Sequence, residues 1–275
     1  MTKKKVAYLF LSYGDVNQAG LWERYFHGHE DSTVIAVHTA DRFETRTPFM
    51  KANLIPYWVS TGWGTLGLVI AQIELIRYAL RDPHVERLCL CSGSCVPIKT
   101  YQTTYDMLFE HDMSWIGLYK QYQSRMAKVT HLDFSSFRKH SQWVMLTRKH
   151  ASMLVRFNYL SDFARCIIPD EHYVGSVLVH LGEEGNILHR EQTVVNWHRI
   201  SPVQMSPIEY NQISDENIQQ WRFAHSIFAR KFKPESNIAD KWNDIVSGIE
   251  LSDAVMEAPV PPVSEDNENI ASSER

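Results

Sequence analysis

Two acidic residues behind a proline, Asp170 and Glu171 in the stretch Ile168–Tyr173, are the residues of this sequence best suited to move a proton. An apolar run with the i, i+3, i+4, i+7 spacing of a helix face follows them, which makes Asp170 the expected N-cap and places Glu171 in the first turn. The helix dipole favours a charged carboxylate there. An ionised, rigidly held glutamate suits a general base that deprotonates an alcohol. The alternative is that Glu171 only stabilises a helix start.

A second pair, Arg230 and Lys231, places two adjacent cations between Phe228 and Phe232. Cations in an apolar frame are expected to be partly buried and to need anionic partners. A structural ion pair is one interpretation. The other is a clamp on a diphosphate, with lysine as a point charge and arginine as a planar fork. A base and such a clamp together predict an inverting sugar transfer, in which the cations stabilise the leaving UDP.

Several familiar signatures are absent from the sequence. It has no DxD pair for a metal on a sugar diphosphate, no phosphate-binding glycine loop, no GxGxxG and no GxSxG. The spacings at His27/His29 and at His131/Asp133 lie in polar surroundings and do not make a convincing metal site. We therefore expect neither a metal nor another cofactor. A metal-dependent hydrolase that uses the histidines with the Asp170/Glu171 pair remains the alternative enzyme class.

The composition is that of a soluble globular protein. Of 275 residues, 44% are hydrophobic and 22% are charged, and the net charge is -4. No basic tract suggests nucleic acid. The apolar run after the basic N-terminus ends at Leu11, too short for a membrane span, and lacks a signal-peptide cleavage site. Buried free thiols in a reducing compartment are expected for all four cysteines: Cys89, Cys91, Cys95 and Cys166.

Apolar runs alternate with amphipathic stretches along the chain. Strands are expected at 5–13, 33–38, 54–59, 87–91, 114–118, 141–146 and 192–198, and helices at 17–27, 66–80, 101–110, 147–157 and after Glu171. This alternation predicts an α/β fold with a mostly parallel sheet flanked by helices. Ligands bind beyond the carboxyl ends of such strands, here Ser12–Gly14, His38–Thr39 and Ser92–Ser94, which suggests a nucleotide cleft. We expect a single domain at 1–250 and a disordered acidic tail at 251–275.

Five motifs in their order along the chain are similar to those of one family. They are an opening strand and helix (Lys5–Phe26), the end of the second strand (Val37–Thr39), a loop before Pro-Ile (Ser92–Ile98), the stretch Pro169–His172 and the terminal motif Phe228–Phe232. The chain thereby resembles the core-2/I-branching glycosyltransferase family, which also holds the peptide O-xylosyltransferases and plant relatives.

This resemblance implies a GT-A type (Rossmann-like) fold and a metal-independent, inverting mechanism with Glu171 as the base. It implies donor (UDP) binding by Ser12, Tyr13, His38, Thr39, Trp63, Gly64, Ser92, Gly93, Arg230 and Lys231, with Arg199 and Arg222 as candidates for a second diphosphate arginine. It implies acceptor binding by Gln142, Trp143, Asp170 and His172.

The branch of the family is indicated by two features. Trp63–Gly64 resembles the xylosyltransferase and plant branches, which favours UDP-xylose as the donor, with UDP-GlcNAc next. Cys95 stands where core-2 enzymes and xylosyltransferases carry Asp, as it does in the plant branch.

The chain also departs from the family. The eukaryotic members are usually Golgi proteins with a membrane anchor and disulfides, and neither is visible here. We therefore expect a soluble, cytoplasmic protein of bacterial or viral origin that acts on a UDP-sugar donor and a carbohydrate acceptor. The non-enzymatic alternative is a glycan-binding module that kept the fold and lost turnover.

Overall fold

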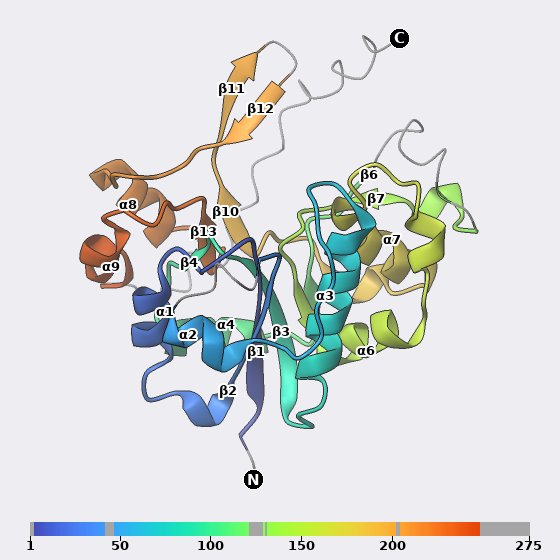
Figure 1. The fold of residues 1–275 in the computed structure, drawn as a ribbon, viewed down its shortest axis with the longest axis horizontal. Helices are drawn as coiled ribbons and strands as arrows, with labels where there is room; N and C mark the ends of the chain where they lie inside the picture. Colours follow the sequence, from blue (N-terminus) through green and yellow to red (C-terminus); the bar gives the residue numbers. More distant parts are fainter. Residues whose placement is uncertain (1–2, 42–46, 121–128, 130, 202–203, 248–275) are drawn as a thin grey trace.

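A six-stranded sheet runs through the centre of the protein, in the order β2-β1-β3-β8-β5-β9 (Figure 1). In this computed structural model, residues 3–41, 47–120, 129, 131–201 and 204–247 are described. The strands are β1 (Lys5–Ser12), β2 (Thr33–Thr39), β3 (Val85–Ser92), β5 (Ser114–Trp115), β8 (Met145–Thr147) and β9 (Ile187–Leu188). β1 is parallel to β2 and β3, and β5 is parallel to β9, whereas β8 is antiparallel to both its neighbours.

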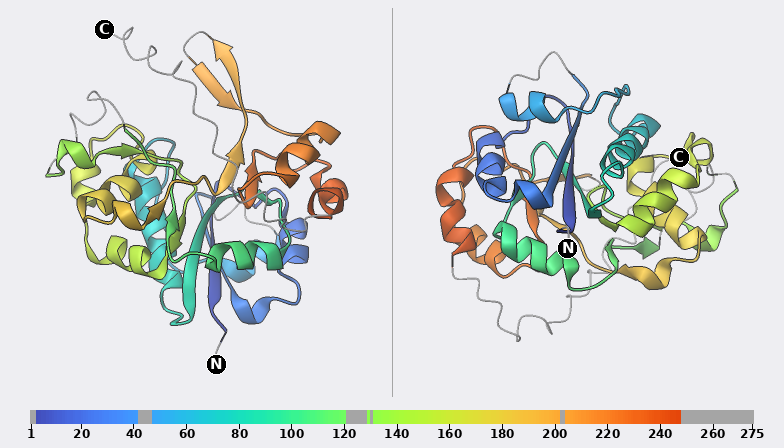
Figure 2. Two further views of the ribbon diagram at one scale, coloured as in Figure 1. Left: turned by 180° about the vertical axis from the view of Figure 1, so that it is seen from behind. Right: turned by 90° about the horizontal axis from the view of Figure 1, so that it is seen from below.

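Helices cover both faces of this sheet (Figures 1 and 2). On one face lie α1 (Ala19–Phe26), α2 (Pro48–Asn53), α4 (Tyr101–Phe109), α8 (Asp215–Arg222) and α9 (Ile238–Val246). On the other lie α3 (Leu66–Ala79), α6 (Arg148–Arg156) and α7 (Tyr173–His180). The expected α/β class, with a mostly parallel sheet flanked by helices, is confirmed.

The apolar run of β1 is continuous because both of its faces are buried. Val6, Tyr8 and Phe10 enter one core, and Ala7 and Leu9 enter the other, as the two-residue period of a strand requires. The first core is rich in aromatic rings: the Trp22 ring meets that of Phe10 at 4.9 Å, edge to face. β1 and β3 are packed on both faces by these two cores, which fixes the position of their carboxyl ends.

Among the described residues, three smaller sheets accompany the central one. β4 (Val96–Pro97), β10 (Thr193–Val195) and β13 (Phe228–Arg230) form one, in the order β10-β13-β4, and bring the end of β13 to the loop after β3. The hairpin of β11 (Trp197–Ser201) and β12 (Gln204–Pro207) stands out from the body in both ribbon figures. β6 (Tyr119–Lys120) pairs with β7 (Arg138–Lys139). Short 3₁₀ turns occur at Glu30–Ser32, Phe134–Ser136, Leu160–Phe163, Pro169–Glu171 and Glu184–Asn186.

Not every expected element forms. The strand expected at 54–59 is wrong: Leu54 makes an isolated bridge to Val37, and Pro56 has no N–H to offer a neighbouring strand. The strand expected at 192–198 is divided between β10 and β11, and that at 114–118 is reduced to β5. The tail at 251–275 lies outside the described residues, and its disorder, like the single-domain organisation, stays a prediction.

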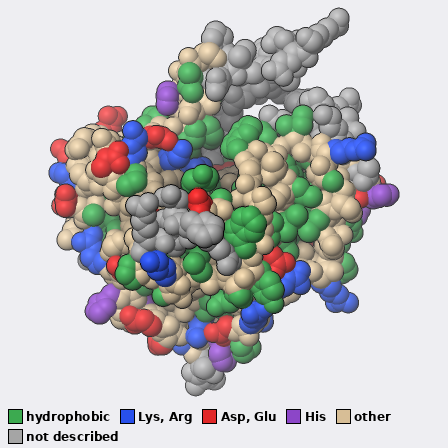
Figure 3. Space-filling view, in the orientation of Figure 1, with side chains coloured by type: hydrophobic (Ala, Val, Ile, Leu, Met, Phe, Trp, Pro, Cys, Tyr) green, Lys and Arg blue, Asp and Glu red, His purple; other side chains and the backbone are tan. Residues whose placement is uncertain are grey.

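The surface and the cysteines agree with the composition. Acidic and basic side chains are interspersed over the face drawn in Figure 3. All four cysteines are buried and free. Within the described part of the chain, no helix is long and apolar enough to cross a membrane.

Candidate active site

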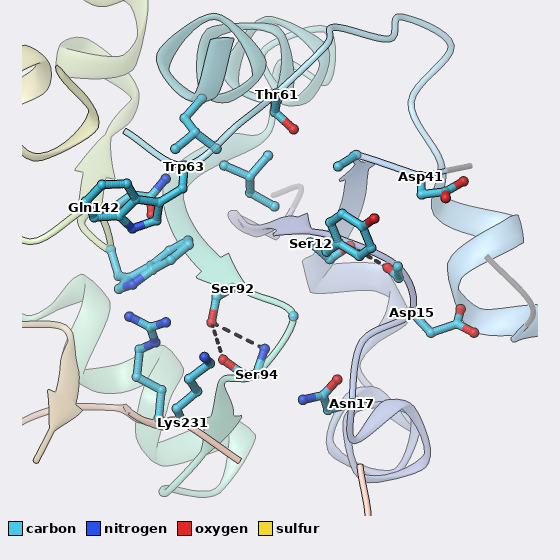
Figure 4. A pocket seen from close by; sticks show the side chains of 18 of the residues that line it. Ser12, Asp15, Asn17, Asp41, Thr61, Trp63, Ser92, Ser94, Gln142 and Lys231 are labelled. Carbon is cyan, nitrogen blue, oxygen red and sulfur yellow. Dashed lines mark hydrogen bonds between the residues drawn. The ribbon is translucent and has the colours of Figure 1, made fainter. Parts of the chain in front are cut away.

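A cavity of about 1020 Å³ opens at the carboxyl ends of β1, β2, β3 and β13 (Figure 4). Its lining comes from segments far apart in sequence: Leu11–Asp15, Asn17, Ala40–Asp41, Thr61–Trp63, Leu68, Ser92–Ser94, Gln142–Trp143, Arg230–Lys231 and Pro234. This is the edge of an α/β sheet at which ligands bind, and the volume is large enough for a nucleotide sugar.

The floor of the cavity is formed where the ends of β1 and β3 meet. Gly93 approaches β1 so closely that a Cβ on it would lie 2.8 Å from the Ser12 Cβ. The Gly93 carbonyl accepts a hydrogen bond from the Asn17 N–H at 2.8 Å. Ser92 and Ser94 share a hydrogen bond between their hydroxyls at 3.1 Å. Glycine at 93 is therefore required by packing.

Arg230 enters the cavity from the end of β13 and lies over Trp143. Its guanidinium carbon is 5.1 Å from the indole ring, within cation–π range, and its Nε has no hydrogen-bond partner among the described residues. Burial lowers the pKa of this guanidinium, and Cys95 and Glu171 oppose that change. Arginine stays protonated in proteins even so, which leaves a largely buried cation in the lining of the cavity.

Lys231 lies next to Arg230, and Figure 4 shows it reaching toward the cavity beside Ser94. Its Nζ is paired with the Glu209 carboxylate at 2.7 Å, and both side chains are about half exposed. The contact with Lys231 lowers the pKa of Glu209. Exposed pairs of this kind contribute little to stability, so a competing anion can take Lys231 over at small cost.

The opposite side of the cavity is acidic and polar. Asp15 and Asp41 lie there, across from Lys231 and Gln142 in Figure 4. Asp15 is fixed by the Thr47 N–H and hydroxyl, the latter at 3.0 Å. The cavity thus has cations at one end and oxygen acceptors at the other, the polarity that suits a diphosphate joined to a base and ribose.

Glu171 lies beside this cavity rather than in its lining. It ends the 3₁₀ turn Pro169–Glu171, which precedes α7, and its carbonyl accepts the His140 N–H at 2.8 Å. Its carboxylate is half-buried and lies 3.5 Å from the Lys139 Nζ. The charge of Glu171 reaches Arg230, so the two are electrostatic neighbours. Glu171 is accordingly held by backbone contacts near the cationic end of the cavity.

Asp170 is not the N-cap of the following helix. That position belongs to His172, and no side chain caps α7. Ile168 precedes the turn in a left-handed conformation with φ of 53°, which is rare for a β-branched residue and turns the chain sharply before Pro169. This turn, instead of a capped helix start, sets the direction of Glu171.

The two neighbours of Glu171 point inward. Asp170 is buried, and its Oδ1 has no hydrogen-bond partner among the described residues. Burial, reinforced by the Glu171 charge, raises the pKa of Asp170 to about 6. The His172 ring is fully buried and stacks on Phe137, with its Nδ1 3.0 Å from the Ile168 carbonyl. Neither side chain is presented to the cavity, so both predicted acceptor contacts lack support in the geometry.

Many of the other predicted residues meet in the cavity: Ser12, Tyr13, Trp63, Ser92, Gly93, Gln142, Trp143, Arg230 and Lys231. Tyr13 and Trp63 are strongly exposed there, at 77% and 85%. His38 and Thr39 lie behind the lining and support it, through hydrogen bonds from the Val59 N–H to His38 Nε2 and from the Thr39 hydroxyl to the Tyr13 carbonyl.

Gly64, Arg199 and Arg222 do not line the cavity. Gly64 has a φ of 67°, and a Cβ placed on it would lie 3.7 Å from the Ile168 side chain, so the loop that carries Trp63 packs against the turn before Glu171. Arg199 lies on the exposed hairpin. Arg222 ends α8 and donates to the Asp244 carbonyl. Neither arginine is placed to complete a diphosphate site.

The sequence analysis missed several residues of the site. Asp15, Asn17 and Asp41 follow the ends of β1 and β2, so the strand-end rule was sufficient to find them. Lys139 and Glu209 contact Glu171 and Lys231 only through the folding of distant segments, and no local pattern marks them. Among the described residues, no three His, Cys, Asp or Glu side chains gather as a metal site would require.

Together these features define an α/β protein with a nucleotide-sized cleft, two cations at one end of it and a glutamate beside them. The profile of the Core-2/I-Branching enzyme family matches residues 6–222, most of the chain, and the protein belongs to that family. The resemblance inferred from the motifs is thus confirmed.

A curated relative and two solved structures are similar to the chain. The protein is 28% identical over 231 residues to "Glycosyltransferase BC10" of Oryza sativa subsp. japonica, which covers 70% of this chain but only 57% of that protein's length. A197 from STIV shows 12% identity and a TM-score of 0.32, with 72% of this chain and 86% of that chain covered. Mannose-1-phosphate geranyltransferase from Thermus thermophilus shows 11% identity and a TM-score of 0.27, with 55% and 53% covered.

Proposed function

We propose that this protein is an inverting, metal-independent glycosyltransferase that moves a sugar from a UDP-sugar to a hydroxyl of a carbohydrate acceptor. One observation carries the proposal: Arg230 and Lys231 face a nucleotide-sized cavity, and Glu171 lies within electrostatic reach of Arg230. Membership of the Core-2/I-Branching family and the name of the rice relative support the glycosyltransferase class.

In the proposed reaction, Glu171 accepts the proton of the acceptor hydroxyl as its oxygen forms a bond to the anomeric carbon of the donor. The bond from that carbon to the β-phosphate oxygen breaks, and UDP leaves with the electron pair. Negative charge on the diphosphate grows during this step. Arg230 and Lys231 stabilise that charge best in the transition state, because they are already in place before the reaction starts.

The donor is proposed to be UDP-xylose, with UDP-GlcNAc as the next choice, because Trp63–Gly64 resembles the xylosyltransferase and plant branches. Trp63 is exposed at the cavity wall, where an aromatic ring can stack on a sugar or a base. UDP release from a panel of UDP-sugars, measured with simple glycosides as acceptors, tests this choice.

The same assay with excess EDTA tests the absence of a metal requirement. Transfer activity that persists in EDTA supports the cation clamp. Transfer activity that is lost in EDTA and restored by manganese or magnesium contradicts the clamp and favours metal-dependent chemistry. A protein that UDP stabilises against heat, but that releases no UDP from any donor, is a binding module instead of an enzyme.

A further inference from the structure

A second carboxyl, that of Glu191, lies near Lys139. Glu191 follows β9, and its Oε1 lies 3.5 Å from the Tyr119 hydroxyl. Tyr119 is the residue directly opposite Lys139 in the β6–β7 pair. Lys139 in turn lies 3.5 Å from Glu171. Lys139 therefore lies near both carboxyls, 3.5 Å from that of Glu171 and close enough to that of Glu191 for their charges to interact.

Glu191 is held in this position by packing. A Cβ at Gly117 would collide with its carboxylate, so only glycine at 117 admits the side chain where it lies. Its backbone carbonyl accepts the Ser226 hydroxyl at 2.7 Å, which ties it to the segment before β13. This fit keeps the Glu191 carboxyl beside Tyr119.

We propose that Glu191 is a positioning residue for the base, because its carboxylate shares Lys139 with Glu171 and so controls how fully that lysine neutralises Glu171. This rests on the proposed role of Glu171 in glycosyl transfer. When Glu191 is neutral, Glu171 alone holds Lys139. When Glu191 is ionised, it draws the ammonium toward itself, and the Glu171 carboxylate is freer to take a proton from the acceptor.

The titration of Glu191 gives this arrangement a pH dependence. Burial raises its pKa to about 7, and Lys139 and then Tyr119 oppose the rise. Below that pH the carboxyl is neutral, and above it the carboxylate competes for Lys139. Transfer is therefore expected to rise as pH increases through 7.

Other charged and titratable groups surround Glu191 and Glu171. Arg190, next to Glu191, lies over the Trp115 ring at 4.6 Å, and His189 accepts the Leu118 N–H. Burial lowers the pKa of His140, beside Lys139, to about 3, so this ring carries no charge. On the Glu171 side lie Arg230, which stays charged, and Asp170, whose pKa is raised to about 6.

The pKa of Asp170, about 6, is close to that of Glu191, about 7, so the effects of the two titrations on turnover must be distinguished. The variant Asp170→Asn removes its titration and leaves that of Glu191 in place. A rise in turnover centred near pH 7 that survives in Asp170→Asn belongs to Glu191 and not to Asp170. A rise that disappears in that variant overturns the proposal.

The first test is the pH profile of UDP release by the full chain. The wild type is expected to gain about threefold in turnover between pH 6 and 8. Glu191→Gln should stay at the low-pH level throughout, because the amide resembles the neutral carboxyl. Glu74→Gln is the matched control: Glu74 is a partly buried glutamate paired with Arg77 at 3.4 Å, far along α3, and its variant should follow the wild type. An unchanged rise in Glu191→Gln overturns the proposal.

The second test needs no turnover, which separates this proposal from the proposed function. The Glu191 carboxyl is titrated by carbon NMR in the wild type, Lys139→Met and Glu171→Gln. Loss of Lys139 should raise the pKa of Glu191. Loss of the Glu171 charge should lower it, because Lys139 is then no longer shared. Unaltered Glu191 titration in both variants overturns the sharing, whether or not the protein transfers sugar. If the pKa of Glu191 shifts in these variants but turnover does not depend on Glu171, Lys139 is still shared by the two carboxylates, and Glu171 is not the base.

Discussion

Arg230 lies over the indole of Trp143, with the guanidinium carbon 5.1 Å from the ring, and its Nε has no hydrogen-bond partner among the described residues. The ring fixes the plane of the guanidinium without using its donors. Burying a cation without an anionic partner costs free energy. This arrangement is what the proposed role of Arg230 in binding the donor diphosphate requires.

The first prediction concerns the planar shape of that cation. Arg230→Lys keeps the charge but loses the fork and its stacking on Trp143, so UDP binding should weaken about tenfold. Calorimetry with UDP measures this. Arg156→Lys is the control, since Arg156 lies over the Phe157 ring at 5.4 Å, on α6 and away from the cavity, and should bind UDP as the wild type does. Equal affinity for UDP in Arg230→Lys contradicts a fork on the diphosphate.

The second prediction concerns the base. Glu171→Gln should reduce turnover by roughly two to four orders of magnitude, the scale of general-base catalysis, with UDP affinity nearly unchanged. Glu216→Gln, an exposed glutamate in the first turn of α8, should have normal turnover. Near-normal turnover of Glu171→Gln removes this residue from the mechanism.

How much of this site was predictable depends on whether its contacts are local. Glu171 and the pair Arg230/Lys231 stand in short motifs, and the strand ends at Ser12 and Ser92 follow from the alternation of elements. The stacking of Arg230 on Trp143 joins segments nearly ninety positions apart and has no local signal. The same is true of Lys139 and Glu209, which provide the charges nearest to Glu171 and Lys231.

Two errors in the sequence analysis have physical reasons. The apolar spacing after Glu171 fixes α7 but not its first residue, and the left-handed Ile168 turns the chain so that Asp170 points inward instead of capping the helix. At 54–59, β-forming residues are present, but the Trp58 indole and the Val59 N–H bind the end of β2 as a loop. Hydrogen bonds that involve the Trp58 and His38 side chains stand in place of the backbone hydrogen bonds of a strand pair.

The third prediction follows from the burial of Asp170. Its pKa is about 6 in the folded protein against an ordinary 3.8, so the fold favours the neutral carboxyl. Stability from this group is fully present below pH 3.8 and is lost as the pH rises through 6. By linkage, the loss in the free energy of unfolding amounts to about 3 kcal/mol at pH 8. Asp170→Asn should therefore raise the melting temperature at pH 8 by several degrees and change it little at pH 4. Thermal unfolding at the two pH values measures this, and an equal shift at both contradicts it.

The fourth prediction concerns the competition for Lys231. In the free protein Glu209 holds this lysine at 2.7 Å, and UDP must displace the carboxylate to use it. Glu209→Gln should therefore tighten UDP binding, by up to about fivefold, since exposed ion pairs contribute about 0.2 to 1 kcal/mol. Lys231→Ala should weaken UDP binding and slow transfer more, because the charge on the leaving diphosphate grows as the bond breaks.

Uridine separates a contact with the diphosphate from a general loss of the site. Calorimetry with uridine, which has no phosphate, should give the same affinity in the wild type, Glu209→Gln and Lys231→Ala. The melting temperature of both variants should stay close to that of the wild type, because both side chains are about half exposed. In the double variant, the gain from Glu209→Gln should vanish, since no lysine remains to be released. A gain that persists there, or a loss of uridine binding in Lys231→Ala, shows that Lys231 does not contact the diphosphate.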